Sequence, residues 1–184
     1  YGRIWYFRDI TERKKAEEAL RASERKARAI FDQTYEFIGL LSLDGTLLEA
    51  NSTALMHAGV SGSDVLGKPF WKTSWWRHSS DVQARIRKAV ETVAAGEDVR
   101  FETTYVAATG GICWMDFSLR PMRDAAGKIV YLMPEGHDIT ERKKAEDALT
   151  TSEKKYRLLV EQIPAIVYTA KTDKESTTLY ISPQ

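Results

Sequence analysis

The sequence predicts an α+β fold in which a five-stranded antiparallel sheet carries helices on one side and is flanked by a linker helix at each end. Three observations lead to this prediction. Five short apolar or alternating runs are separated by turn residues, as in antiparallel sheets. Segments with helix signals lie together between the second and third runs. The charged segment DITERKKAE occurs twice, at Asp9 and at Asp138, and brackets these elements.

The composition is that of a folded domain without a pronounced charge. Of the 184 residues 43% are hydrophobic, and 27 Lys and Arg stand against 26 Asp and Glu, for a net charge of +1. This balance gives no long-range field for nucleic acid or an anionic membrane, so we expect neither as a partner. No apolar run is long enough to cross a bilayer, and the lone Cys113 forms no internal disulfide. We therefore expect a cytoplasmic location, with any membrane tether of the parent protein outside this fragment.

The two copies of the charged segment predict linker helices over residues 9–33 and 141–162. In each copy an aspartate stands three residues before a glutamate, as Asp9 does before Glu12, which is the spacing of a capping box. Strong helix formers follow for several turns without Gly or Pro.

Small and apolar residues recur along both helices at alternating intervals of four and three residues. This narrow stripe between Lys, Arg and Glu is typical of a parallel two-stranded coiled coil, so we predict a homodimer joined through the linker helices. Ala and Ser in the stripe would make the coil weak and able to change register. The alternative is a single amphipathic helix lying on its own domain. The predicted seam comprises Ala16, Leu20, Ser23, Ala27 and Ile30, and then Ala145, Leu149, Ser152, Tyr156 and Leu159.

The region between the two predicted linker helices begins with a predicted hairpin. The apolar run 37–43 ends at Asp44-Gly45, a strong hairpin turn, and 46–51 returns as the second strand. Asn51 stands at a capping position before a short helix over 53–59. The further predicted elements are a short helix within 61–67, a Trp-rich loop at 71–80, a long helix over 81–96, and strands over 99–107, 112–122 and 129–136.

The order and motifs of these elements resemble a PAS domain, the sensory module of bacterial signalling proteins. The matching stretches are LDGTLLEANSTAL, DVLGKPF and RPMRDAAGKIVYLMPEGHDITERK, the last with the terminal D-I-T. The resemblance implies a complete PAS domain over 34–140. Residues 1–8 resemble the last strand of a preceding PAS domain, and 163–184 resemble the start of a following one. We therefore expect a piece of a longer multi-PAS protein.

The resemblance also implies a pocket between the sheet and the helices, bordered by the Trp-rich loop. Members of the family bind haem, flavins, small acids or nothing. The indoles of Trp71, Trp75 and Trp76 would suit a flat ligand such as a flavin. Arg77 would pair with an anionic group, and His78 would ligate haem iron. The alternatives are indoles that fill the core, a solvated Arg77, and a His78 near a helix cap.

The sequence gives little support for a metal site, a photoreaction or catalysis. His57 and His137 have no metal-ligand spacing, so we expect no metal site. Cys113 is predicted on a strand. In blue-light PAS photoreceptors the reactive cysteine lies in a different segment, so the family resemblance argues against a flavin–cysteinyl photocycle. No catalytic motif occurs, so the fragment is not expected to be an enzyme. Having no cofactor is the main expectation, with a redox flavin or haem as the alternatives.

The D-I-T junction carries the functional prediction. In PAS domains the corresponding Asp and Thr tie the last strand to the exit helix, which implies this role for Asp138 and Thr140, with Ile139 between them. Asp9 and Thr11 would serve the preceding unit in the same way. We predict a module that relays a change caused by a ligand or a neighbouring domain to coiled-coil linkers and a downstream effector. The alternative is a ligand-free spacer and dimerisation unit.

The partners implied by this resemblance lie within the same chain. They are adjacent PAS domains and a downstream effector. The family resemblance favours a sensor histidine kinase as this effector, and a diguanylate cyclase or phosphodiesterase next.

Overall fold

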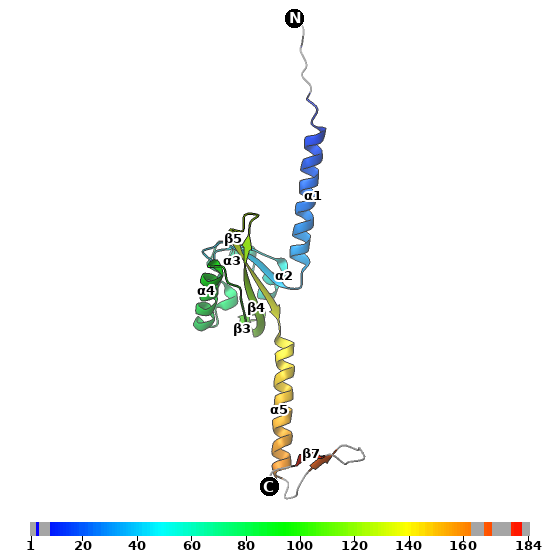
Figure 1. Cartoon of the computed structure of the whole chain (residues 1–184), viewed down its shortest axis with the longest axis vertical. Helices are drawn as coiled ribbons and strands as arrows, with labels where there is room; N and C mark the ends of the chain where they lie inside the picture. The colour runs from blue at the N-terminus through cyan, green and yellow to red at the C-terminus, as the bar shows by residue number, and fades with distance from the viewer. Residues whose placement is uncertain (1–2, 4–7, 163–167, 171–177, 182–184) are drawn as a thin grey trace. The chain divides into compact units, whose positions relative to one another are not determined.

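The computed structural model describes residue 3 and residues 8–162, 168–170 and 178–181 (Figure 1). The chain divides into two compact units, Tyr1–Asp138 and Ile139–Gln184. The first contains the sheet and its helices, and the second contains the C-terminal helix and a strand pair. We describe each unit by itself.

The first unit is built on one five-stranded sheet with the strand order β2-β1-β5-β4-β3. Every neighbouring pair is antiparallel, as predicted. The last strand in sequence, β5, lies in the centre between β1 and β4, and β2 and β3 form the edges. The strands are β1 Phe37–Leu41, β2 Leu47–Ala50, β3 Val99–Val106, β4 Ile112–Arg123 and β5 Ile129–Asp138.

The helical segments of the domain follow β2 and precede β3, and Figure 1 shows α4 beside the sheet. Asn51 caps α2 by accepting a hydrogen bond from the Ala54 amide, and Gly59 ends this helix with a φ of 64°, in the left-handed region that favours glycine. The segments are α2 Ser52–Ala58, α3 Gly62–Val65, the 3₁₀ turns η1 Phe70–Lys72 and η2 Ser74–Trp76, and α4 Ser80–Ala94.

The core lies between the inner face of the sheet and these helices. On β4, Met115, Phe117 and Leu119 are buried at alternate positions, as the period-two pattern predicts. On α4, the buried Ile86, Ala89, Val90 and Val93 share one helical face. The predicted α+β architecture, with helices on one side of a five-stranded antiparallel sheet, is confirmed.

Two local predictions differ from the structure. The Trp-rich segment is not one irregular loop, because it contains η1 and η2. The capping box at Asp9 is also wrong: α1 (Thr11–Gln33) is preceded by Ile10, whose φ of −114° and ψ of 13° are not the extended conformation that a capping residue needs. Asp9 instead accepts a hydrogen bond of 2.9 Å from the Thr11 amide.

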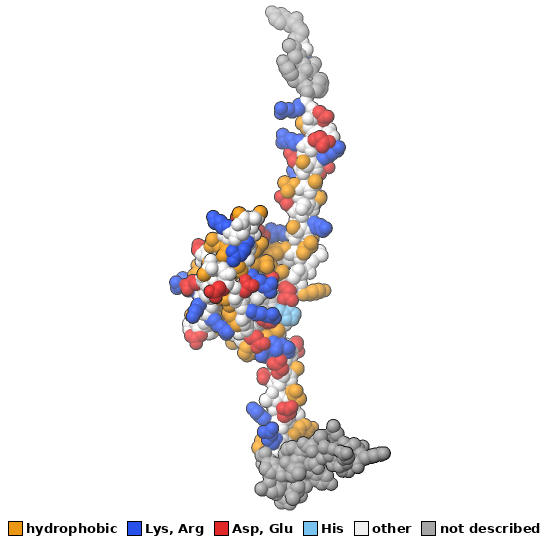
Figure 2. All heavy atoms as spheres, viewed as in Figure 1, with side chains coloured by type: hydrophobic (Ala, Val, Ile, Leu, Met, Phe, Trp, Pro, Cys, Tyr) orange, Lys and Arg blue, Asp and Glu red, His pale blue; other side chains and the backbone are white. Residues whose placement is uncertain are grey.

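The linker helix α1 buries none of its residues. Figure 2 shows its hydrophobic side chains among charged ones along an open surface. In the predicted seam Leu20 is 60% exposed and Ile30 is 62% exposed. The last turns of α1 contact the domain, since Arg28 pairs with Glu49 of β2 at 3.0 Å. The helix lying on its own domain and the pairing with a second copy therefore both stay predictions.

The second unit contains α5 (Thr140–Gln162), β6 (Tyr168–Ala170) and β7 (Thr178–Ile181). Leu149, Tyr156 and Leu159 of the predicted seam are at least half exposed. β6 and β7 pair antiparallel at the place where the opening strands of a following domain are predicted. The rest of 163–184, and most of the strand predicted at 1–8, lie outside the described residues. Among the helices that are described, none combines the length and the apolarity that a membrane span requires.

Candidate functional site

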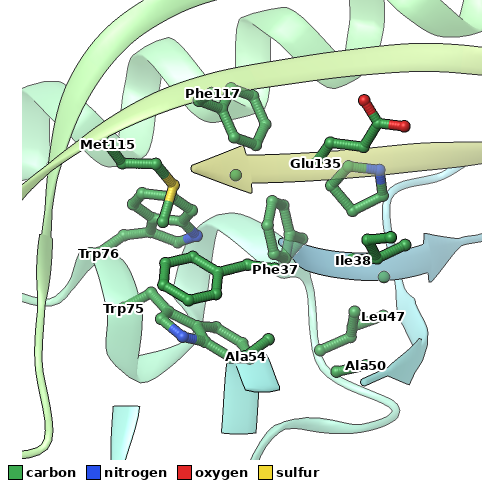
Figure 3. A pocket seen from close by; sticks show the side chains of 14 residues that line it. Phe37, Ile38, Leu47, Ala50, Ala54, Trp75, Trp76, Met115, Phe117 and Glu135 are labelled. Carbon is green, nitrogen blue, oxygen red and sulfur yellow. The ribbon is translucent and has the colours of Figure 1, made fainter. Parts of the chain in front are cut away.

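A small pocket lies between the sheet and the helices of the first unit (Figure 3). The space inside it that the centre of a water-sized sphere can reach is about 40 Å³. Its walls are formed by β1, β2, β4 and β5 on one side and by α2, η1 and η2 on the other. The lining residues are Phe37, Ile38, Gly39, Leu47, Ala50, Ala54, Phe70, Trp75, Trp76, Met115, Phe117, Pro134, Glu135 and Gly136.

Gly136 of β5 has no side chain, and this keeps space open in the pocket. It lies between Phe37 of β1 and Phe117 of β4 in the register of the sheet. A Cβ atom at this position would come within 2.7 Å of Met115 Sδ and 3.1 Å of Met115 Cε. Any larger residue would therefore push the Met115 side chain out of its place.

Trp76 brings an unused hydrogen-bond donor into this apolar region. Its side chain is 1% exposed, and its Nε1 has no hydrogen-bond partner among the described residues. The ring is fixed by edge-to-face contacts with Phe70 and Phe117, at centroid distances of 5.5 and 5.9 Å. Figure 3 shows the nitrogen-bearing edge turned toward the space between Met115 and Phe37. A buried donor without a partner is costly, so an acceptor in the pocket would be stabilised there.

The five predicted ligand residues do not gather at one point. Trp75 and Trp76 line the pocket, where they also belong to the core. Trp71 packs against the turn at Gly45 instead, since a Cβ there would meet its ring at 2.6 Å. Arg77 is exposed, and His78 is half-buried with Nε2 2.8 Å from Thr104 Oγ1. None of these last three residues lines the pocket.

The cofactors that the family resemblance raised do not fit this pocket. A volume of about 40 Å³ is far below the roughly 300–1,000 Å³ of pockets for drug-sized ligands, and haem and flavins are larger still. His78 contacts β3 rather than the pocket, so it is not placed as an axial ligand. Within the described residues no three His, Cys, Asp or Glu side chains gather where they could hold a metal ion.

The exit of the domain is marked by a hydrogen bond that the sequence did not reveal. Tyr105 of β3 donates its hydroxyl to Asp138 Oδ2 at 2.8 Å, across the intervening strand β4. Tyr105 is 0% exposed, and burial, followed by the bond to Asp138, raises the pKa of its hydroxyl well above the ordinary value. The hydroxyl therefore stays protonated and acts as a donor. The available sequence signal was an inward-facing tyrosine, since a buried phenol usually finds a partner.

The junction residues occupy the end of β5 and the start of α5. Asp138 is the last residue of β5 and Thr140 the first of α5, with Ile139 between them. The carbonyl of Ile139 accepts the Lys143 amide at 2.9 Å, which forms the first turn of α5. At the other predicted junction, the backbone and side chain of Thr11 donate to Asp9 and hold the pKa of this carboxyl below its ordinary value.

Asn51, which the sequence predicts only as a helix cap, organises the N-terminal end of the domain. Its Nδ2 donates to the carbonyls of Phe31, in α1, and Glu36 at 3.0 and 2.8 Å. Its Oδ1 accepts from the amides of Ile38 in β1 and Ala54 in α2 at 3.1 and 3.0 Å. Asn51 is 0% exposed, so one buried amide joins the end of α1 to a strand and a helix.

Comparison with known proteins agrees with this architecture. Residues 31–144 match the family described as PAS fold. Over 142 residues, 76% of this chain, it is 44% identical to sensor histidine kinase TmoS of Ectopseudomonas mendocina. It is 34% identical over 147 residues to hybrid signal transduction histidine kinase D of Dictyostelium discoideum, which covers 79% of this chain. The aligned parts make up 15% and 10% of these two relatives.

Solved structures share the fold. The PAS domain of an HTR-like protein from Haloarcula marismortui superposes with a TM-score of 0.55 at 22% identity, covering 68% of this chain and 99% of that one. The PAS domain of BvgS from Bordetella pertussis superposes with a TM-score of 0.54 at 20% identity, covering 73% and 98%. Together with the family match over more than half of its length, this places the chain in the PAS fold family.

Proposed function

We propose that residues 34–140 form a sensory and relay module of a longer signalling protein whose effector is a histidine kinase. The two relatives above are named as histidine kinases. Because this chain spans only a small share of their length, the kinase itself would lie in another part of the parent protein. Adjacent PAS domains and that effector are its proposed partners, and composition favours the cytoplasm.

One observation carries the proposal. The central strand β5 lines the pocket with Pro134, Glu135 and Gly136 and ends two residues later at Asp138. The helix α5 begins at Thr140. A strand that is hydrogen-bonded on both sides moves as a unit, so a displacement at the pocket reaches the junction with the linker.

The pocket favours a small, neutral ligand with a hydrogen-bond acceptor. Its lining is dominated by apolar and aromatic side chains, and Trp76 Nε1 offers a donor that the described residues leave unused. A charged ligand would lose its hydration here, because none of the described lining residues is Lys, Arg or His, and the carboxylate of Glu135 is already bound by Ser118 and Arg120. A ligand larger than a few atoms requires Met115, which is unbranched and flexible, to adopt another rotamer.

The output in this proposal is a change in paired linker helices. The small residues Ala16, Ser23 and Ala27 in the seam of α1 make a weak coiled coil that can adopt two registers. A parallel homodimer through α1 and α5 would convert a shift at Asp138 into a change of register. The linkers would then act on the effector.

A ligand-free spacer and dimerisation module is the second candidate, and the small volume of the pocket favours it. Absorption spectroscopy and native mass spectrometry of the purified chain separate the two functions. A bound small molecule supports the sensor, whereas an unchanged chain mass and no change of stability with small neutral acceptors support the spacer.

The relay is tested in the full-length kinase with Asp138→Ala. We expect the fold to persist while autophosphorylation no longer responds to the upstream stimulus. Asp147→Ala, an exposed change on α5, is the matched control and should leave the response intact. An unaltered response in the Asp138 variant would reject the proposed relay.

A further inference from the structure

We infer that Tyr105 is a positioning residue for Asp138 and that, through Phe37 and Asn51, it connects the end of α1 with the exit junction. This inference rests on the relay function proposed above and adds the route, meaning the series of contacts through which a signal would pass from α1 to Asp138. It concerns signals that arrive from the preceding domain rather than from a ligand in the pocket.

The route begins where α1 ends. Asn51 Nδ2 binds the Phe31 carbonyl in the last turns of α1. Beside it, Ser52 Oγ donates to the Asp32 carbonyl at 2.7 Å and Thr53 Oγ1 donates to the Thr34 carbonyl at 2.6 Å. Three consecutive side chains thus hold the segment that joins α1 to the sheet. A rotation or shift of α1 has to move these partners or break their hydrogen bonds.

The next step leads from Asn51 to β1. Asn51 Oδ1 accepts a hydrogen bond from the Ile38 backbone amide, and the backbone amide of Asn51 donates to the Ile38 carbonyl at 2.9 Å. The position of Ile38 fixes that of its neighbour Phe37, which is 7% exposed. The Phe37 ring packs edge-on against Tyr105, with centroids 5.6 Å apart and an interplanar angle of 69°. The side chains of Asn51, Phe37 and Tyr105 are all buried, so a displacement of one presses on the next.

The last step leads from Tyr105 to the exit. Its ring contacts Phe37 on one side, and its hydroxyl binds Asp138 Oδ2. A tilt of the ring at Phe37 therefore moves the hydroxyl at Asp138. Since Phe37 also lines the pocket, a ligand and the incoming helix would act on the same ring. The module can consequently relay a neighbour's state without any ligand.

The test measures amide hydrogen exchange in the 184-residue chain. Thr53→Val removes one hydrogen bond at the end of α1 and leaves the buried Asn51 in place, so the domain stays folded. We expect the Lys143 amide, in the first turn of α5, to exchange about two- to thirty-fold faster relative to β4 amides that report global unfolding. With Tyr105→Phe in addition, this acceleration should disappear.

Ser79→Ala is the control, because it removes the cap of α4 and Ser79 takes part in none of the contacts of this route. It should leave the exchange of Lys143 unchanged. The inference is overturned if Thr53→Val has no effect on Lys143, if its effect is the same in the Tyr105→Phe variant, or if Ser79→Ala has an equal effect. Coupled exchange together with a kinase that ignores Asp138→Ala would instead reject the proposed function and leave this route standing.

Discussion

The hydroxyl of Tyr105 lies 2.8 Å from Asp138 Oδ2, so a residue of the edge strand β3 binds the last residue of the central strand β5. The bond spans 33 residues of sequence and passes the strand β4. It gives the end of β5 a side-chain contact in addition to its backbone pairing. Removing this hydrogen bond should therefore change the stability of the domain and the behaviour of the junction between β5 and α5.

Tyr105→Phe should lower the free energy of unfolding by about 1.5–3 kcal/mol, because it removes a hydrogen bond to a carboxylate while keeping the buried ring. Urea denaturation followed by tryptophan fluorescence measures this loss. Tyr131→Phe is the control, since Tyr131 of β5 is 40% exposed and should cost little. Equal effects of the two substitutions would show that the bond to Asp138 adds no stability.

The contribution of Tyr105 should depend on pH in the alkaline range. Its pKa is raised in the folded state, by burial first and by Asp138 second, above the ordinary tyrosine value of about 10. The unfolded chain therefore loses this proton first, so the stability is fully present below that value and falls as pH rises beyond it. The difference in unfolding free energy between the wild type and Tyr105→Phe should shrink from neutral pH to about pH 11. A constant difference would contradict the assigned cause.

Asn51→Ala should be among the most damaging single substitutions, with a loss of roughly 3–5 kcal/mol. It leaves two carbonyls and two amides at the end of α1, β1 and α2 without their buried partner. Thermal or chemical denaturation measures the loss. Ser79→Ala removes only one capping bond, to the Val82 amide, and should cost about 1 kcal/mol. The order of the two variants is the decisive result.

Leu149→Lys should weaken self-association through the predicted seam, because a charge at a core position of a coiled coil is desolvated on pairing. Sedimentation equilibrium of the 184-residue chain gives the dissociation constant. Leu158 is 57% exposed on the same helix but lies off the seam, so Leu158→Lys is the control. A dimer that withstands Leu149→Lys, or that responds equally to both variants, would reject the seam assignment.

Gly136→Ala should destabilise the domain by about 1–3 kcal/mol by overpacking. Its new methyl group would fall 2.7 Å from Met115 Sδ, so the Met115 side chain must move within the pocket. Shortening that side chain with Met115→Val should recover part of the loss, which a double-mutant cycle measures. Additive losses would mean that the two residues do not compete for the same space.

The sequence by itself determined the order of the elements. Alternation on β4 and the helical period of α4 come from the burial of one face, and both are local properties that a single segment displays. Asp44-Gly45 similarly marks its turn because the required backbone conformation depends on these two residues. The family resemblance then linked the elements into a fold with a ligand pocket and an exit at Asp138.

The tertiary structure decided what each polar side chain does. Asn51 reads as a simple helix cap in sequence, yet it also binds carbonyls 15 and 20 residues away. Trp71 and Trp75 are neighbours in one aromatic stretch, but only Trp75 lines the pocket. Tyr105 and Asp138 meet because β4 pairs with β3 on one side and with β5 on the other. Such contacts depend on strand order and packing across the core, which bring together residues that share no local pattern.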